Sequence, residues 1–276
     1  MKKSLIKENC GAYALITGAA GGIGQGVAEL LHQQNYTLIL VDINSDILDQ
    51  MKHQYPGAMT RSVDLSDPSD TETLCQEIES LDGDLAYAFV NAGIVTPGCV
   101  IDTDRAALVR DVGINLRSAM CVNHACASIM ERQGFGHIIN TVSMAAVVSL
   151  KGAAAYSASK FGLRGFLIAL KSELRAQRVH VSMLLPSAID TAMLQFEAKH
   201  GGSALNFIST PLSVNDVVLA FKKAQQHKKL EYYVPYSDSL LGRLVCVFPQ
   251  MIDYLYPALE KLGERGRRRF IQSKGI

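Results

Sequence analysis

Apolar residues recur along the chain with two alternating periods. Short apolar runs predict buried β-strands at residues 12–17, 37–41, 61–64, 85–90, 136–142, 179–185 and 231–234. Between these runs, helical spacing of apolar residues predicts helices at about 23–34, 45–54, 68–80, 103–131, 155–177 and 214–226. Such alternation predicts an α/β fold with a doubly wound parallel sheet of about seven strands and helices on both faces. Because no repeat or linker divides the chain, we expect residues 1–276 to form a single domain with a C-terminal helical extension.

Composition excludes several classes of protein. A chain of 276 residues with 48% hydrophobic and 19% charged residues can form a large core, and its net charge of +1 argues against nucleic acid as the main partner. The six cysteines form no C-x-x-C pair and the seven histidines lack metal-ligand spacing, so we expect no metal site and a cytoplasmic location. No run of about 20 apolar residues predicts a transmembrane helix, and residues 1–8 lack the apolar core of a signal peptide.

A glycine-rich turn separates the first predicted strand from the first predicted helix. Its sequence is Thr17-Gly18-Ala-Ala-Gly21-Gly22-Ile-Gly24. Glycines let the backbone turn tightly and approach phosphates, and the following helix start offers unpaired N–H groups. The order of strand, glycine turn and helix therefore predicts a site for the pyrophosphate of a dinucleotide.

Asp42 closes the second predicted strand, eighteen residues after Gly24. An acid at about this distance is expected to accept hydrogen bonds from the ribose hydroxyls of the dinucleotide. A carboxylate would also repel a 2′-phosphate, and no Arg or Lys occupies the glycine turn or the positions just after Asp42. The predicted cofactor is therefore NAD rather than NADP.

Tyr156 and Lys160 lie four residues apart, thirteen residues after Ser143. Residues at i and i+4 share a helix face, so the phenol and the ammonium group are expected to be neighbours. A positive charge about 4 Å from the phenol would favour the phenolate by roughly 4 kcal/mol, which lowers its pKa by about three units. By itself this pair occurs by chance on many helix surfaces, and its context decides whether it is functional.

Other polar residues and turns fall at the ends of the predicted strands. These are Asp64-Leu65, Asn91-Ala92-Gly93, Ser143 and the stretch from Pro186 to Thr191, with Asn115 in a helical segment. Together with the glycine turn and the Tyr156/Lys160 pair, their order and spacing closely resemble the classical short-chain dehydrogenase/reductase family. The resemblance runs from about Ala12 to Thr191 and more loosely to Pro235, and it implies a Rossmann fold.

The resemblance also implies a role for each of these residues. Tyr156 would be the general acid/base, Lys160 would lower its pKa and bind the nicotinamide ribose, Ser143 would polarise the substrate oxygen, and Asn115 would hold a water in a proton relay. The implied cofactor-binding residues are Gly18, Gly22, Ile23, Gly24, Asp42, Asp64, Leu65, Asn91, Ala92, Gly93, Tyr156, Lys160, Pro186, Ile189 and Thr191.

Structural alternatives exist for some of these residues. Asn115 would then be a buried polar residue that binds backbone groups, and Asp64 an acid at a helix N-terminus. Asn91 is expected to be more structural than chemical. One residue departs from the family pattern, because Ser187 stands where a glycine usually follows Pro186. Its side chain would crowd the nicotinamide or add a hydroxyl near the substrate.

The expected reaction interconverts a secondary alcohol and its ketone by hydride transfer with NAD. Two segments, Ala192–Pro211 and Ala145–Val148, are rich in apolar residues, which favours a hydrophobic steroid-, retinoid- or acyl-like substrate. Alternatively, these residues only pack a lid closed. The rival function is a non-catalytic NAD-sensing regulatory protein on the same fold. Another rival, a sugar-nucleotide epimerase or dehydratase, would need a larger C-terminal domain than the residues after Thr191 provide.

The segment at about 236–276 combines an apolar stripe with a basic cluster. Its apolar residues recur at helical spacing and are expected to be interrupted by Pro249 and Pro257. They are Leu240, Leu241, Leu244, Val245, Val247, Phe248, Met251, Ile252, Leu255, Tyr256, Leu259 and Leu262. Residues 261–276 contain six basic residues and one acidic residue, a net charge of +5. The segment can pack on its own or another subunit, cover the substrate pocket, make peripheral contact with an anionic membrane, or remain a solvated tail. A homo-oligomer, dimer or tetramer, is also expected from the family resemblance.

Overall fold

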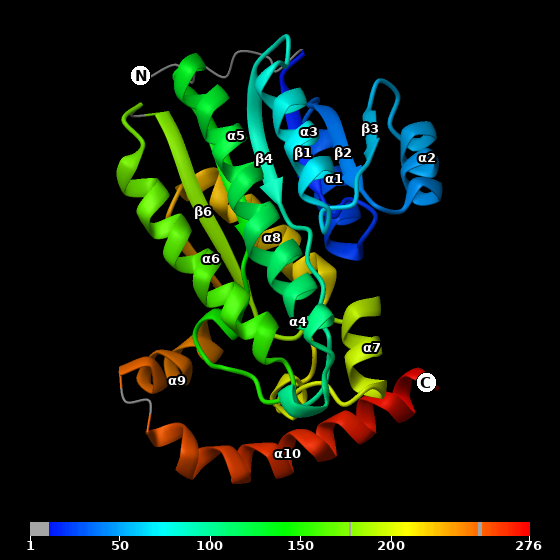
Figure 1. Cartoon of the computed structure of the whole chain (residues 1–276), viewed down its shortest axis with the longest axis vertical. Helices are drawn as coiled ribbons and strands as arrows, with labels where there is room; N and C mark the ends of the chain where they lie inside the picture. Colours follow the sequence, from blue (N-terminus) through cyan, green and yellow to red (C-terminus); the bar gives the residue numbers. More distant parts are fainter. Residues whose placement is uncertain (1–10, 177, 248–249) are drawn as a thin grey trace.

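The computed structural model describes residues 11–176, 178–247 and 250–276 (Figure 1). The sequence-based predictions for residues 1–8, Cys10, Gln177, Phe248 and Pro249 lie outside these ranges. Everything that follows concerns the described residues.

The described residues contain one sheet of seven parallel strands in the order β3-β2-β1-β4-β5-β6-β7. The strands are β1 (Tyr13–Thr17), β2 (Thr37–Asp42), β3 (Met59–Ser62), β4 (Leu85–Val90), β5 (Phe135–Thr141), β6 (Arg178–Pro186) and β7 (Glu231–Val234). Because parallel strands end at the same edge, the segments after β1, β2, β4, β5 and β6 meet there. The predicted doubly wound sheet is confirmed.

Helices cover both faces of the sheet (Figure 1). One face packs against α3 (Pro68–Glu79), α5 (Ala119–Gln133) and α6 (Ala154–Glu173), and the other against α1 (Gly22–Gln33), α2 (Ser45–Gln54) and α8 (Val214–His227). Successive strand residues serve opposite faces, since Leu15 joins the first core and Ile16 the second. The strands are therefore buried on both sides, which explains their continuous apolar runs.

Several elements differ from those predicted. The third strand begins two residues before the predicted residue 61 and ends at Ser62, because its partner β2 ends at Asp42, which pairs with Ser62. The residues predicted as one helix at 103–131 form α4 (Arg105–Val112), a π-helical turn η2 (Gly113–Ser118) and α5, and a short turn η1 (Val100–Asp102) precedes them. α6 ends at Glu173 rather than at residue 177.

The described residues contain further helices after β5, β6 and β7. They are the short turn η3 (Met144–Ala146), α7 (Ala192–Lys199), the turn η4 (Ala204–Phe207), α9 (Tyr236–Val247) and α10 (Met251–Lys274). Figure 1 shows α9 and α10 at the end of the molecule toward which β4 points. The predicted interruption at Pro257 is wrong, because α10 continues through it. The φ angle of proline suits a helix, and the other backbone bonds and the packing of α10 hold the helix despite one missing N–H donor.

Candidate functional site

The turn between β1 and α1 is folded so tightly that two of its residues must be glycine. Gly18 has a φ of +64°, and a Cβ there would lie 2.8 Å from the Cα of Ala92. A Cβ on Gly24 would lie 2.2 Å from the carbonyl oxygen of Gly18. A side chain at either position would displace backbone atoms, so the glycines of the sequence motif serve the shape of the turn.

The start of α1 faces the segment that follows β6. Gly21 is the N-cap, no side chain caps the helix, and its first turn contains no acid. A Cβ on Gly22 would contact only the Cγ2 atoms of Val214 at 3.4 Å and Thr191 at 3.9 Å, and Ile23 is half-buried. An uncapped helix start carries partial positive charge, so these residues fit the pyrophosphate of a dinucleotide.

Asp42 ends β2, and its carboxylate lies beside the glycine turn. Its Oδ2 accepts a hydrogen bond from the N–H of Ala20 at 3.0 Å, and its Oδ1 accepts one from the N–H of Asn44 at 3.0 Å. These two bonds orient the carboxylate, while each oxygen retains capacity for a further hydrogen bond. The sequence motif and the structure therefore place an oriented acid next to the predicted phosphate site.

Asp64 and Leu65 lie in the turn after β3. The Oδ1 of Asp64 accepts from the N–H of Ser66 at 2.8 Å, and Leu65 is buried in the core. The N-cap of α3 is Asp67, whose carboxylate accepts from the N–H groups of Ser69 and Asp70. Asp64 is thus not the N-cap of that helix, and its carboxylate accepts within the turn that precedes it.

Residues 91–93 are tied to both neighbouring strands. The buried Oγ1 of Thr17 accepts hydrogen bonds from the N–H groups of Asn91 at 3.0 Å and Ala92 at 3.1 Å. The Nδ2 of Asn91 donates to the carbonyl of Gly18 at 3.2 Å, and its Oδ1 accepts from the Oγ1 of Thr141 at 2.8 Å. Asn91 therefore links β1, β4 and β5, which is the structural role expected for it.

Asn115 lies in the π-helical turn η2 and is fully buried. Its Oδ1 accepts from the N–H of Ile94 at 2.8 Å, and its Nδ2 donates to the carbonyl of Ile94 at 2.8 Å. A Cβ on Gly93 would lie 3.1 Å from this Oδ1 and 3.6 Å from the Nζ of Lys160. Asn115 therefore holds the backbone that lies next to the lysine, and it does so across elements rather than within its own helix.

Lys160 lies on α6 with a side chain that is almost fully buried. Its Nζ donates to the carbonyl oxygen of Thr141 at 3.0 Å and lies 5.5 Å from the centroid of the Tyr156 ring. Burial lowers the pKa of Lys160 to about 8. A buried ammonium with a single protein acceptor has further N–H groups available, so it can also bind a ribose hydroxyl.

Tyr156 lies one helical turn before Lys160, and its phenol is hydrogen-bonded to the side chain of Ser143. The Oγ of Ser143 also accepts from the N–H of Ala145 at 3.0 Å. The pKa of Tyr156 is raised by burial, although the hydrogen bond to Ser143 lowers it in part. The expectation that Lys160 lowers this pKa is not met in this structure, because the ammonium binds the carbonyl of Thr141 and burial has the largest effect on the phenol.

The segment after β6, residues 186–191, lies at the same carboxyl edge of the sheet as the other predicted site residues. Pro186 ends β6, Ile189 is buried and pairs with Leu212, and the Oγ1 of Thr191 donates to the carbonyl of Ile189 at 3.3 Å. Thr191 also borders Gly22, as noted above. The structure thus gathers the predicted residues at the carboxyl edge of the sheet, from the glycine turn to the Tyr156/Lys160 pair.

Comparison with known proteins agrees with this geometry. A family model described as short chain dehydrogenase matches residues 12–201, more than half of the chain. The chain belongs to this family. It is 27% identical over 256 residues to the ketoacyl reductase HetN of Nostoc sp. strain PCC 7120, covering 89% of this chain and 88% of that protein.

Solved structures of short-chain dehydrogenases share the fold. A Burkholderia phymatum enzyme in complex with NAD has a TM-score of 0.77 at 22% identity, covering 89% of this chain and 96% of the other. A Burkholderia cenocepacia J2315 enzyme in complex with NADP has a TM-score of 0.73 at 22% identity, covering 89% and 97%. Both nicotinamide dinucleotides therefore occur on this fold.

Ser187, which replaces the usual glycine of such dehydrogenases, points toward the C-terminal extension. Its Oγ donates to the Oδ2 of Asp238 on α9 at 2.8 Å, and its N–H donates to the carbonyl of Val234 at 2.8 Å. The hydroxyl is therefore occupied by a contact within the protein. Ser187 joins the turn after β6 to α9, a link that a glycine could not make.

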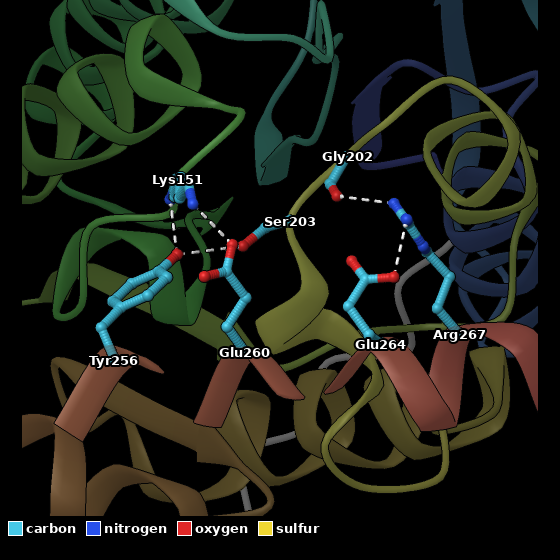
Figure 2. A network of polar contacts seen from close by, with 7 residues as sticks. All are labelled: Lys151, Gly202, Ser203, Tyr256, Glu260, Glu264 and Arg267. Carbon is cyan, nitrogen blue, oxygen red and sulfur yellow. Dashed lines mark hydrogen bonds and ion pairs between the residues drawn. The ribbon is translucent and has the colours of Figure 1, made fainter. Parts of the chain in front are cut away.

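Two loops beside the site are held by α10, the last helix of the described residues (Figure 2). The phenol oxygen of Tyr256 accepts from the N–H of Lys151 at 2.7 Å, and Glu260 pairs with the Nζ of Lys151 at 2.7 Å. On the other loop, the carbonyl of Gly202 accepts from Arg267 at 3.4 Å. Close backbone packing of α10 on η4 requires Gly263, whose added Cβ would overlap the carbonyl of Ala204.

The packing of α9 and α10 buries some of the apolar residues of the predicted lid, residues 192–211 and 145–148, and leaves others exposed. Leu194, Phe207 and Phe270 form a buried cluster between α7, η4 and α10, and residues 145–147 are buried next to α9. Met193 and Phe196 remain exposed. Part of the apolar lid predicted from the sequence therefore packs against the chain itself, and part is free to contact a ligand.

Glu197 is a buried acid of α7 that the sequence did not single out. Its Oε2 accepts from the Nδ2 of Asn206 at 3.0 Å, burial raises its pKa to about 7, and its charge raises the pKa of Tyr156.

Three further residues of the site, Thr17, Thr141 and Arg117, were not predicted from the sequence. Arg117 donates to the carbonyls of Leu65 and Ser66. Thr17 begins the glycine motif and Thr141 ends β5. Their positions at the carboxyl ends of strands could have identified them as residues of the site.

Proposed function

We propose that this dehydrogenase uses NAD to interconvert a hydrophobic secondary alcohol and its ketone. The observation that carries the proposal is the convergence of Tyr156 and Ser143, both half-buried, with the buried Lys160 beside the glycine turn. A sensor that only bound a dinucleotide would not need a phenol beside a serine hydroxyl with a buried ammonium 5.5 Å from its ring centroid.

The proposed proton step uses Tyr156 and Ser143. In the reductive direction the phenol of Tyr156 donates its proton to the carbonyl oxygen that the Ser143 hydroxyl polarises, and in the oxidative direction the phenolate takes the proton from the alcohol. When bound, the nicotinamide dinucleotide supplies the hydride donor or acceptor. Because burial raises the pKa of Tyr156, we expect the oxidation rate to rise with pH across the neutral range.

Lys160 and Asn115 support this step. The ammonium of Lys160 bonds the carbonyl that ends β5, and its remaining N–H groups would bind a ribose of the cofactor. Asn115 holds the backbone of Ile94 and thereby the segment beside the lysine. We propose that Asn115 also orients a water that passes the proton toward solvent.

The preference for NAD rests on Asp42. Its carboxylate is oriented by two backbone N–H groups next to the glycine turn, where it would accept from both ribose hydroxyls and repel a 2′-phosphate. Asp64, Leu65 and residues 91–93 would border the adenosine half, and Ile189 and Thr191 the nicotinamide half. The relative affinity for NAD and NADP tests this assignment directly.

The substrate and the oligomer are proposed from surface properties. Met193 and Phe196 are exposed on α7 beside the site, which supports an apolar substrate. Val109 on α4 and Phe161 and Ile168 on α6 are also exposed, and these helices contact each other. An apolar surface on α4 and α6 supports a homo-oligomer formed through these helices.

The decisive experiment measures reduction of NAD by a panel of secondary alcohols graded from small and polar to steroid-sized. Tyr156→Phe should lower turnover by at least about a hundredfold while NAD binding, measured by calorimetry, is retained. NADP serves as the cofactor control, and Asp42→Ala should reduce the preference for NAD. Full activity of Tyr156→Phe would refute the mechanism. NAD binding without turnover on any alcohol or ketone would favour the sensor.

A further inference from the structure

The helix α9 exposes a continuous apolar stripe. Tyr236, Leu240, Leu244 and Val247 recur at helical spacing on one side, and Val247 is 68% exposed. On the opposite side of the helix, a Cβ on Gly242 would lie 3.1 Å from Met144 and Val147. The inner side of α9 therefore packs beneath the turn that follows Ser143, and its apolar stripe points away from the protein.

The helix α10 has two equally distinct sides. Its inner side carries Tyr256, Glu260, Gly263, Arg267 and Phe270, which contact the loops described above. Its outer side carries the exposed residues Tyr254, Lys261, Leu262, Arg265, Arg268 and Arg269. None of the ion pairs within the described part of the chain involves these four cations. The outer side of α10 therefore carries four cations without an ion-pair partner among the described residues, next to the exposed Tyr254 and Leu262.

Two exposed helix surfaces of this kind lie at the same end of the molecule (Figure 1). We propose that the outer sides of α9 and α10 together dock on the surface of an anionic lipid bilayer. Aliphatic side chains that enter the interface and cations that face anionic headgroups are the two features of peripheral membrane helices. No helix in the described ranges is long and apolar enough to cross a bilayer, so the contact is peripheral.

A second copy of the chain fits this surface less well. A twofold interface places the same surface of each subunit in contact, so four cations of one α10 would face four of the other. Like charges in contact oppose association, whereas an anionic bilayer neutralises them. Docking would also place the lipid surface directly outside the two loops that α10 holds beside the catalytic site (Figure 2).

The test is flotation of the full chain with phosphatidylserine-containing vesicles and with purely phosphatidylcholine vesicles, at low and high salt. We expect binding to the anionic vesicles only, weakened by salt. The triple variant Arg265→Gln, Arg268→Gln, Arg269→Gln should bind on the order of a hundredfold more weakly, since each cation near the surface contributes roughly fivefold. The variant Leu240→Gln, Leu244→Gln, Val247→Gln should also lose binding.

Matched controls remove equal charge or equal apolar surface elsewhere. Lys52→Gln, Lys222→Gln, Lys223→Gln changes exposed cations of α2 and α8, and Val100→Gln, Ile101→Gln, Leu219→Gln changes exposed apolar residues outside the proposed subunit interface. Both controls should float like the wild type. Absence of flotation at low salt, or equal loss in test and control variants, would overturn the proposal. A smaller molar mass of the α9 variant in solution without lipid would instead identify a subunit interface, and would overturn it as well.

Discussion

The two halves of the site are held in place by different means. At the glycine turn, backbone atoms determine the shape, because added Cβ atoms on Gly18 and Gly24 would overlap neighbouring backbone. At the substrate side, α7 and η4 are held by side chains from a helix more than 50 residues away in sequence, such as Tyr256 and Arg267. The cofactor half is thus built by local chain geometry, and the substrate half by contacts between distant segments.

This difference indicates where each half tolerates change. Backbone overlap has no low-energy alternative, so the cofactor half should fail abruptly when a glycine is replaced. The substrate half rests on several moderate contacts, so single replacements there should shift substrate binding and stability by smaller steps. Three substitutions test this contrast, from the largest expected effect to the smallest.

Gly24→Ala should have the largest effect. Its Cβ would overlap the carbonyl of Gly18, so we expect a loss of about 3 kcal/mol in the free energy of unfolding together with the loss of NAD binding. Urea unfolding and calorimetry measure the two quantities. The control is Gly165→Ala on exposed α6, where a Cβ has open space and should stabilise the helix by up to about 1 kcal/mol. Similar effects of both variants would contradict the backbone explanation.

Glu197→Gln should change how stability depends on pH. Burial raises the pKa of Glu197 from 4.5 to about 7, so the folded state binds the proton more tightly than the unfolded state. Stability of the wild type should therefore fall as pH rises from 4.5 to 7, by at most about 3 kcal/mol. The glutamine variant should lack this fall and be the more stable protein at pH 8, but not at pH 4.

Thermal unfolding between pH 4 and 8 checks this expectation. Glu173→Gln, on the exposed end of α6, is the matched control and should retain the pH dependence of the wild type. If Glu197→Gln had the wild-type pH profile, the buried acid would not be the source of the dependence.

Tyr256→Phe should have the smallest effect of the three. It removes the phenol oxygen that accepts from the N–H of Lys151, so we expect a loss of about 1 kcal/mol of stability and a higher KM for the alcohol, with unchanged NAD affinity. Lys151→Met is the control, because it retains that N–H and removes only the exposed ion pair with Glu260. It should leave the melting temperature unchanged. Weakened NAD binding in Tyr256→Phe would show that the two halves are coupled.

The same contrast explains what could be predicted from the sequence. The sheet, the glycine turn, Asp42 and the Tyr156/Lys160 pair follow from local periodicity and spacing, and the structure gathers them at one edge. The contact of Glu197 with Asn206 in η4 and the link from Ser187 to Asp238 on α9 join separate elements, whose relative positions no local pattern specifies. The direction of the pKa shift of Tyr156 was missed for a related reason, because desolvation depends on the whole surrounding fold.

The order of strands in the sheet has a consequence for synthesis of the chain. β1 lies between β2 and β4, and each later strand from β5 to β7 is added beside the strand made before it. On the side where the sheet grows, the edge strand therefore changes from β4 to β5 and β6 until β7 emerges, and each of these temporarily unpaired edges favours association with other chains. The loops beside the site are secured later still, after α10 has left the ribosome. We expect premature termination within α10 to yield a chain with a complete sheet and an unsecured substrate half.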